Sequence, residues 1–383
     1  MFRYYSGSQM LSQGVLLALN SGGEINEVDQ ACRRVTVTDG LPDTTSWFNS
    51  WTGLGDMLIG QANDDIARNR RISASNKLRR ACVYFGLCER YIPHTDERKA
   101  YCYARMQDCF RRFAELATEP LDYVEIPYEN GASLPALFIP AATPGPAPTI
   151  VFIDGFDLYK EFVYLRKNGP AARLRGMALL IVDTPGIGEA LRQRGLTARH
   201  DAEVPLRYCL DYLGKRNEVD QARIGLIGLS LGGYYAPRAA AFEKRVKACV
   251  AFGAQWDVGT RWRVEHYGKG STRSNLSAPD TQLLWVTGQE TREAALDFLD
   301  DFRLDGVAQK IEVPLLVVHG EADHLVSLAD AERLAKVAPK GELVVTTAEY
   351  GGEGHCCMDG MQTGVDLIYD WLAEKLRAAV APR

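Results

Sequence analysis

Hydrophobic and polar positions along the chain change their spacing near Pro120. Before that residue, from about residue 9 to residue 118, apolar side chains recur three and four positions apart, and no alternating strand is evident. This spacing predicts a helical amino-terminal region, residues 1–119. The predicted helices are one capped by Asp43 or Thr44 that carries Trp47, Phe48 and Trp51, one over Ser73–Phe85, and one over Asp96–Ala117.

After Pro120, short runs rich in β-branched and aromatic residues alternate with helical segments, which is typical of a mostly parallel sheet with helices on both faces. The first two runs are close enough for an antiparallel hairpin. The long connection between the sixth and seventh runs predicts a lid insertion within about residues 254–312. The pattern therefore predicts an α/β domain over residues 120–383. Its expected strands are Tyr123–Tyr128, Leu134–Ile139, Thr149–Ile153, Ala178–Asp183, Arg223–Ile227, Ala248–Phe252, Pro314–Val318 and Leu343–Thr347.

The most specific motif lies between the expected strand Arg223–Ile227 and a helical stretch that begins near Tyr234. Its sequence is Gly228-Leu229-Ser230-Leu231-Gly232-Gly233, which contains G-x-S-x-G. In such an elbow the serine occupies a strained turn, and glycines are needed on either side because neighbouring backbone crowds those positions. The alternative is a glycine-rich turn without chemistry. The strand before the motif and the helix after it favour Ser230 as a nucleophile.

A serine hydroxyl needs a base to remove its proton, and the base needs a carboxylate to hold its tautomer. In this fold the acid follows a late strand, and the histidine follows the last one. Asp323 and His355 occupy those places, with Glu321 as an alternative acid. His319 and His324 lie too close to the acid strand to serve as the base. The other histidines, which precede that strand, are His94, His200 and His266.

The oxyanion hole of such a site uses two backbone N–H groups, one after the nucleophile and one from the loop after the third strand. The candidates here are Leu231 and Phe156. In the same loop region, Asp157 and Glu161 are candidates for assisting catalysis or binding substrate. Capping a helix is the alternative role for Asp157.

Composition narrows the function further. Hydrophobic residues make up 46% and charged residues 24% of the chain, and the formal net charge is −5, which gives no electrostatic reason to bind nucleic acid or an anionic membrane. The nine cysteines show no zinc or disulfide spacing, and Cys356 and Cys357 are interpreted as packing residues. With no secretion signal or membrane-spanning run in the sequence, we expect a soluble cytoplasmic enzyme that needs no cofactor or metal and acts on a small molecule.

Three segments together resemble one branch of the α/β-hydrolase superfamily. This branch includes the 2,6-dihydroxypseudooxynicotine hydrolases, the fermentation-respiration switch proteins and fungal hydrolases that shorten polyketide chains in pigment biosynthesis. The helical amino-terminal region is similar to the cap of that branch. The segments are the elbow motif continued through Tyr235, Asp183-Thr184-Pro185-Gly186-Ile187-Gly188-Glu189, and Asp154-Gly155-Phe156-Asp157-Leu158-Tyr159-Lys160-Glu161.

The resemblance implies hydrolysis of a carbon–carbon bond next to a ketone, in a β-diketone, a polyketide of secondary metabolism or an acyl-aromatic compound. It also implies that a carboxylate near the oxyanion loop assists, and the matching residue is Asp157. Where some relatives carry Gly-Gly-Leu-Glu, this chain has Asp154-Gly155-Phe156-Asp157.

Two other functions stay open at this stage. The same triad can serve a carboxylesterase, lactonase, amidase or acyltransferase, and a binding protein could carry the triad unused. If the helical region covers the site, Trp47, Trp51 and Tyr84 are candidate pocket residues. That region could equally provide a homodimer contact.

Overall fold

The computed structural model describes residues 2–267 and 279–378. These residues form two compact units. A helical unit comprises residues 2–120 with residues 279–282, and an α/β unit comprises residues 121–267 and 283–378.

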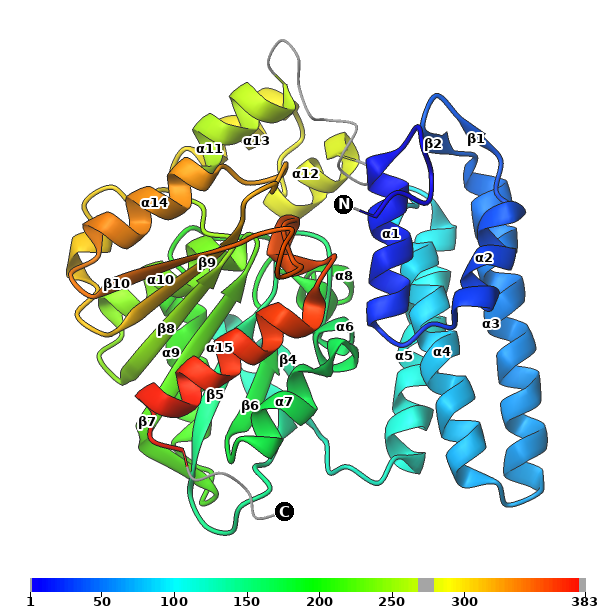
Figure 1. Ribbon diagram of the computed structural model, residues 1–383, viewed down its shortest axis with the longest axis horizontal. Coiled ribbons are helices and arrows are strands. Elements are labelled where there is room, and N and C mark those ends of the chain that lie inside the picture. Colours follow the sequence, from blue (N-terminus) through cyan, green and yellow to red (C-terminus); the bar gives the residue numbers. More distant parts are fainter. Residues whose placement is uncertain (1, 268–278, 379–383) are drawn as a thin grey trace. The chain divides into compact units, whose positions relative to one another are not determined.

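The α/β unit is built on one mixed sheet (Figure 1). Its described strands number eight and follow the order β10-β9-β8-β7-β5-β6-β4-β3. The pair β3 and β4 is antiparallel, as is the pair β4 and β6, and the other neighbours are parallel. The strands are β3 (Asp122–Pro127), β4 (Ser133–Ile139), β5 (Ala147–Ile153), β6 (Ala178–Val182), β7 (Val219–Leu229), β8 (Val246–Phe252), β9 (Leu315–Gly320) and β10 (Gly341–Thr346).

Burial explains why the hydrophobic pattern located these strands. Every residue of β5, β6 and β9 is buried, as expected for parallel strands covered on both faces. The edge strand β3 instead alternates exposed and buried residues along its second half. The predicted α/β-hydrolase fold, with a mostly parallel sheet and an antiparallel hairpin at its start, is confirmed, and strand ends differ from expectation by a few residues.

Helices cover both faces of the sheet. In Figure 1, α15 (Met361–Lys375) and α7 (Gly169–Leu174) lie on one face, and α9 (Glu203–Leu213) and α10 (Gly232–Phe242) lie on the other. Helix α14 (Leu328–Val337) packs on β9 and β10. The short helices α6 (Lys160–Val163) and α8 (Gly188–Arg192) follow the carboxyl ends of β5 and β6. The loops that leave these strand ends carry the candidate site.

The connection between β8 and β9, expected to hold a lid, is helical where it is described. It contains α11 (Val258–Arg261), α12 (Pro279–Thr287) and α13 (Arg292–Leu299). Residues 268–278 of the expected lid lie outside the described residues.

The helical unit contains α1 (Gln9–Asn20), α2 (Ile25–Arg33), α3 (Thr44–Ala67), α4 (Arg71–Arg90) and α5 (Glu97–Leu116), and α4 packs against both α3 and α5. Asp43 and Asp96 cap α3 and α5 by accepting backbone N–H groups. The unit also holds a short antiparallel hairpin, β1 (Val37–Thr38) and β2 (Leu41–Pro42), where no strand was expected. Asp39 and Gly40 form its turn with φ of 51° and 77°, and the Asp-Gly pair was the signal for it.

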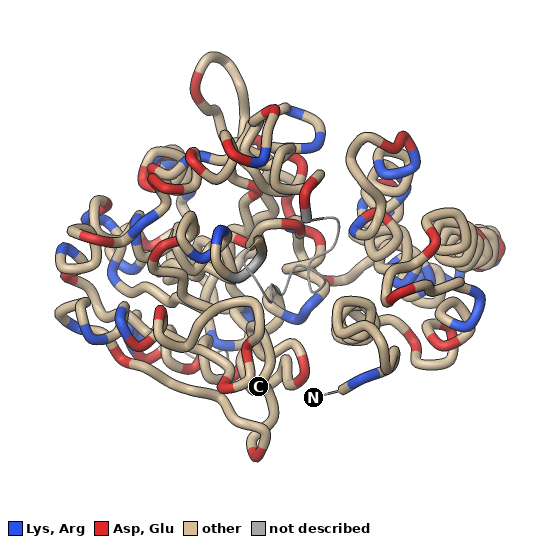
Figure 2. Tube along the Cα trace, turned by 90° about the horizontal axis from the view of Figure 1, so that it is seen from above, with Lys and Arg blue, Asp and Glu red and all other residues tan. Residues whose placement is uncertain are grey.

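Both units contain acidic and basic residues (Figure 2). Acidic and basic residues are interspersed along the trace of each unit (Figure 2). Across the described part of the chain, no helix has the combined length and apolar character that crossing a bilayer requires.

Candidate active site

Ser230 stands on a tight turn between β7 and α10. Its φ is +59°, a left-handed conformation that is strained for a residue with a side chain. Neighbouring backbone leaves no room for a side chain at the flanking glycines. A Cβ on Gly228 would lie 1.9 Å from the carbonyl oxygen of Gly232, and one on Gly232 would lie 2.5 Å from that of Ile153. Side chains at either position would force the turn open, so the local sequence fixes the elbow.

The structure brings Ser230, His355 and Asp323 together although they are far apart in the sequence. The Nε2 atom of His355 lies 2.9 Å from Oγ of Ser230, and its Nδ1 atom lies 2.7 Å from Oδ2 of Asp323. Asp323 follows β9, and His355 lies in a short 3-10 turn after β10. This arrangement can remove the proton of Ser230 through Nε2 while the carboxylate holds the other nitrogen.

Backbone hydrogen bonds orient the carboxylate of Asp323. Its Oδ1 atom accepts the N–H groups of Leu325 at 2.8 Å and Val326 at 3.0 Å, which leaves Oδ2 directed at His355. Burial acts to raise the pKa of Asp323, but the charge and hydrogen bond of His355 outweigh burial and lower that pKa to about 2. The carboxylate is therefore ionised over the whole physiological range.

The same pairing acts on the imidazole. Burial favours the neutral ring, but Asp323 and Cys356 together outweigh burial and raise the pKa of His355 well above its ordinary value. Asp323 therefore stabilises the protonated ring that forms when His355 takes a proton.

The rival residues have other surroundings. Glu321 is exposed, and its Oε1 atom accepts the backbone N–H of Ala348 at 2.8 Å. The Nε2 atom of His319 lies 3.1 Å from the carbonyl of Val326 and 3.8 Å from Oδ2 of Asp323. Burial lowers the pKa of His319, and it lowers the pKa of His324 to about 4. Among these residues, Asp323 is the one whose carboxylate meets His355.

The loop after β5 runs directly against Ser230. A Cβ on Gly155 would lie 2.8 Å from Cβ of Ser230, so the backbone of this loop passes beside that residue. Phe156 is the next residue, and its ring packs on Trp262 with centroids 5.0 Å apart. Leu231 occupies the N-cap position of α10. Both segments expected to form the oxyanion hole thus adjoin Ser230, and the roles of Phe156 and Leu231 stay predictions.

The two carboxylates expected to assist are placed differently. Glu161 lies on α6, is 2% exposed, and its Oε1 atom is 3.0 Å from Nζ of Lys160. Asp157 precedes α6, whose N-cap residue is Tyr159, so Asp157 does not occupy the capping position that was its alternative role. The assisting roles of Asp157 and Glu161 stay predictions.

Trp47, Trp51 and Tyr84, the candidate pocket residues, are buried among one another in the helical unit. Ring centroids of Trp47 and Trp51 are 5.4 Å apart, and those of Trp51 and Tyr84 are 5.8 Å apart. The indole N–H of Trp47 donates to the carbonyl of Cys88, and the Tyr84 hydroxyl donates to Glu27. These contacts are those of core residues, and a role in lining a pocket stays a prediction.

Sequence reasoning missed a buried ion cluster beside the site. Nζ of Lys160 lies 3.0 Å from Glu161, 3.2 Å from Asp183 and 2.7 Å from Glu189. Asp183 also caps α6 by accepting the backbone N–H of Lys160. The sequence did contain a signal for this cluster. Asp183 directly follows the entirely apolar strand β6, so its carboxylate is expected to be buried and to need a cation nearby.

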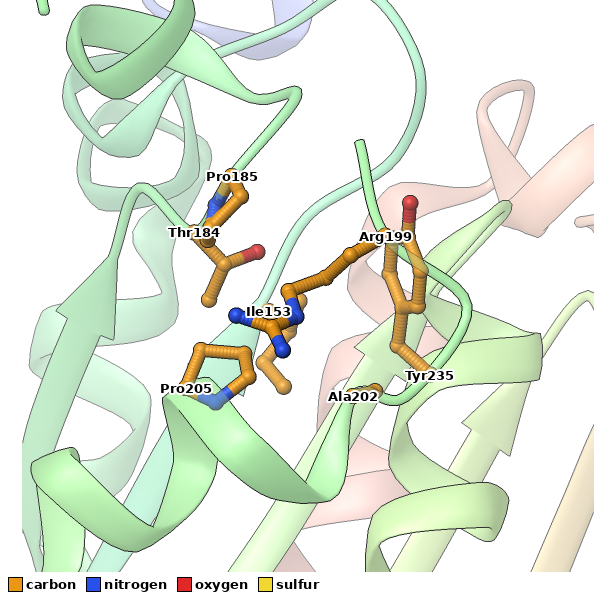
Figure 3. Close-up of a pocket in the computed structure, with 7 residues that line it drawn as sticks. All are labelled: Ile153, Thr184, Pro185, Arg199, Ala202, Pro205 and Tyr235. Carbon is orange, nitrogen blue, oxygen red and sulfur yellow. The ribbon is translucent and has the colours of Figure 1, made fainter. Parts of the chain in front are cut away.

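A small cavity lies near the ends of β5 and β6, with a volume of about 10 Å³. Its lining comes from those strand ends and from α9 and α10, as Figure 3 shows. About one water molecule fits in such a volume, so this cavity is not a substrate site. The lining residues are Ile153, Thr184, Pro185, Arg199, Ala202, Pro205 and Tyr235.

Two protein-family models match this chain, and both describe hydrolases. A family model described as "Esterase FrsA-like" matches residues 40–258, more than half of the chain. The chain belongs to the FrsA-like family of the α/β-hydrolase superfamily. A model of the prolyl oligopeptidase family matches residues 166–379, which contain all three residues of the candidate triad. The protein is thus a hydrolase by family.

Individual relatives agree with this membership. Hydrolase acrC of Aspergillus aculeatus is 32% identical over 75% of this chain and 76% of its own length. The 2,6-dihydropseudooxynicotine hydrolase of Paenarthrobacter nicotinovorans is 28% identical over 89% of this chain and 88% of its own. Alpha/beta hydrolase xenA of Xenoacremonium sinensis is 32% identical, but the chain spans only 59% of its length.

Solved structures share the fold. A crystal structure of 2,6-dihydroxy-pseudo-oxynicotine hydrolase superposes with a TM-score of 0.79 at 23% identity, covering 96% of this chain and 98% of that one. The structure of AbyA5 superposes with a TM-score of 0.72 at 19% identity, covering 93% of this chain and 91% of that one. At these identities the likeness concerns the fold alone.

Proposed function

We propose that this protein is a serine hydrolase that cleaves a carbon–carbon bond next to a ketone, in a β-diketone, polyketide or acyl-aromatic substrate. Ser230 is the nucleophile, His355 the general base and Asp323 the orienting acid. The observation that carries the proposal is the hydrogen-bonded series from Asp323 through His355 to Ser230, at 2.7 and 2.9 Å, with the serine on a strained elbow.

The first half of the reaction forms an acyl-enzyme. His355 takes the proton of Ser230 through Nε2 as Oγ bonds to the substrate carbonyl carbon, and the carbonyl oxygen becomes an oxyanion. Backbone N–H groups of Phe156 and Leu231 hold that oxygen. The carbon–carbon bond then breaks, and its electron pair leaves on carbon.

Carbon is a poor leaving group, so the substrate must delocalise the departing pair into an enolate or a phenol ring. The proton held by His355 goes to that carbon, either directly or relayed through Asp157, and the imidazole is neutral again. Water then attacks the acyl-enzyme, His355 takes its proton and returns one to Ser230, and the acid leaves. The resemblance to hydrolases that act next to ketones and the relationship to a 2,6-dihydropseudooxynicotine hydrolase support this choice of bond.

Ester cleavage is the second candidate. The same triad serves it without any demand on the leaving carbon, and the matching family model is described as esterase-like. Lactones, amides and acyl transfer fall under the same mechanism. A binding protein with an unused triad is a third alternative.

One experiment distinguishes these functions. Purified protein and its Ser230→Ala variant are tested on a panel of aryl esters and β-diketones, and the acyl-enzyme is trapped and located by mass spectrometry. We expect turnover of a β-diketone at a higher kcat/KM than any ester, with acylation at Ser230. Efficient turnover of esters alone would favour the second candidate. Absence of acylation with every substrate and with a fluorophosphonate would leave the binding protein.

A further inference from the structure

Two oppositely charged side chains are buried directly behind the loop that passes Ser230. Asp154, which ends the β5 region, and Arg166 are each 1% exposed. The Nη2 atom of Arg166 lies 3.3 Å from Oδ2 of Asp154, and Oδ1 of Asp154 accepts the backbone N–H of Gly155 at 2.7 Å. The carboxylate therefore joins the arginine to the backbone that adjoins the nucleophile.

The backbone around Arg166 is irregular. Residues Tyr164–Asn168 form a π-helical turn, and Lys167 within it has a φ of +70°. Turns of this kind cost energy and are found frequently at functional sites. Asn168 secures the turn by donating to the carbonyl of Val163 and accepting the hydroxyl of Tyr369.

Apolar side chains surround the arginine. It borders a cavity of about 10 Å³ whose lining includes Phe152, Leu229 and Phe252. Leu229 immediately precedes Ser230, so the guanidinium lies beneath the strands that carry the elbow. A charge in such surroundings interacts strongly with other charges because little water screens it. The position of Arg166 is thus suited to influence charge that develops at Ser230.

We infer that Arg166 and Asp154 form a positioning pair for the oxyanion hole. Asp154 fixes the orientation of the Gly155 peptide, which in turn directs the N–H of Phe156, and Arg166 neutralises the carboxylate so that it does not repel the oxyanion. This inference rests on the proposed function. It also gives a role to Asp154, which stands where some relatives carry glycine.

The charge balance makes the arginine necessary. The charged groups that act on Asp154, besides Arg166, are Asp157 in its own loop and Asp183 after β6, and both are carboxylates. Burial raises the pKa of Asp154, Arg166 opposes this rise, and the two carboxylates add to it. Without Arg166, an uncompensated carboxylate would adjoin the oxyanion whenever Asp154 is ionised.

The test measures how fast a fluorophosphonate labels Ser230, which requires no knowledge of the natural substrate. In this reaction Oγ bonds to phosphorus, fluoride leaves, and the phosphoryl oxygen occupies the oxyanion hole. We expect Arg166→Met to slow labelling at pH 8 by roughly 10- to 100-fold relative to the wild type. The same ratio should become smaller as the pH is lowered, because protonation of Asp154 removes the repulsion. Adding Asp154→Asn to Arg166→Met should restore the pH 8 rate to within about fivefold of the wild type.

If the pair had a purely structural role, the double variant would be labelled no faster than Arg166→Met. That result would overturn the inference. So would an Arg166→Met variant labelled as fast as the wild type. Arg175→Met is the matched control, since Arg175 pairs with Asp366 and Asp370 of α15, and its labelling rate should stay within about twofold. Folding of each variant is checked by its melting temperature.

If Arg166→Met does not fold, two variants of Asp154 carry the test. Asp154→Asn keeps an acceptor for the Gly155 N–H and should slow labelling by about threefold or less, whereas Asp154→Ala removes the acceptor and should slow it by about tenfold. Equal rates for the two would overturn the inference. If the wild type is not labelled, or Ser230→Ala is labelled equally, the proposed function itself fails.

Discussion

Two groups of buried polar side chains lie at the carboxyl ends of the strands, and they differ in what their charges can do. The candidate triad pairs one carboxylate with one titratable ring, and it ends on the Ser230 hydroxyl, which is partly exposed. In the second group, three carboxylates surround the ammonium of Lys160, and one of them, Glu189, also pairs with Arg194. Lys160 and the three carboxylates are each at most 9% exposed.

Burial of charge therefore does not by itself mark an active site. The candidate triad contains a titratable imidazole and a partly exposed serine hydroxyl, which is the proposed nucleophile. The Lys160 cluster contains no hydroxyl that could act as a nucleophile, and it joins α6, the end of β6 and α8. We expect changes in the triad to act on turnover and changes in the cluster to act on stability.

Among the variants proposed here, His355→Ala should lower kcat the most. Without the base, Ser230 keeps its proton, and we expect kcat to fall on the order of 10⁵- to 10⁶-fold while the melting temperature changes little. His324→Ala is the control, because the ring nitrogen 2.9 Å from Oγ of Ser230 belongs to His355, and this variant should retain at least about a third of the activity. A reversed order of the two effects would show that the base is assigned to the wrong histidine.

Asp323→Asn should lower kcat by about 10⁴-fold with little change in KM, because it disturbs the imidazole tautomer and not the pocket. The pH profile sharpens this prediction. In the wild type, kcat/KM should fall below the pKa of His355, which Asp323 raises above its ordinary value, because a protonated ring cannot accept the serine proton. The variant should therefore move this acid limb to lower pH. An unmoved limb would mean that another group controls it.

Lys160→Met tests the other group. Removing this ammonium leaves Glu161 and Asp183 buried without it, while Glu189 keeps Arg194 as a partner. Breaking a buried ion pair in this way typically costs about 3 to 5 kcal/mol of unfolding free energy. Urea unfolding measures the loss, and kcat per folded molecule should stay within about threefold. A large fall in kcat with unchanged stability would move the cluster into the catalytic machinery.

These contrasts also explain what could be predicted from the sequence. Ser230, Asp323 and His355 could be located because each follows a strand, and strand positions are encoded locally in hydrophobic runs. The choice of Asp323 over Glu321 followed from its place in the turn, and the hydrogen bond of Asp323 to His355 agrees with it. The eight strands of the described sheet were located for the same reason.

The Lys160 cluster and the Arg166 pair could not be located in this way. The Lys160 cluster joins α6, the end of β6 and α8, and the Arg166 pair joins residues 12 positions apart. Whether a charged side chain turns inward depends on tertiary packing and on irregular backbone such as that of Lys167. Similarly, the aromatic spacing in α3 predicted a helix, but it could not say whether Trp47 and Trp51 face a core or a ligand. The structure gives each of them buried ring contacts within the helical unit.

Glu161→Gln should have the smallest effect. This variant tests whether Glu161 assists catalysis, as the sequence suggested, or only supports the Lys160 cluster. The carboxyl of Glu161 is buried, and its Oε2 atom has no hydrogen-bond partner among the residues that the structure describes. Burial raises its pKa, against the attraction of Lys160 and with the help of Asp183. Glutamine resembles the protonated acid and keeps an oxygen for Lys160, so kcat should change by less than about threefold and the unfolding free energy by about 1 kcal/mol or less.

The direction of the pH dependence follows from the raised pKa of Glu161. Its stabilising contribution is fully present below the pKa of the unfolded chain, about 4.3, and is lost as pH rises through the higher pKa of the folded state. Because glutamine does not titrate, the variant should gain stability relative to the wild type as the pH rises above the pKa of the unfolded chain, as measured by urea unfolding. Asp183→Asn is the control and should be more damaging, since Asp183 accepts backbone N–H groups of both Lys160 and Glu189. A loss of 100-fold or more in kcat for Glu161→Gln, far above the roughly threefold limit expected of a supporting residue, would instead give Glu161 the assisting role in proton transfer.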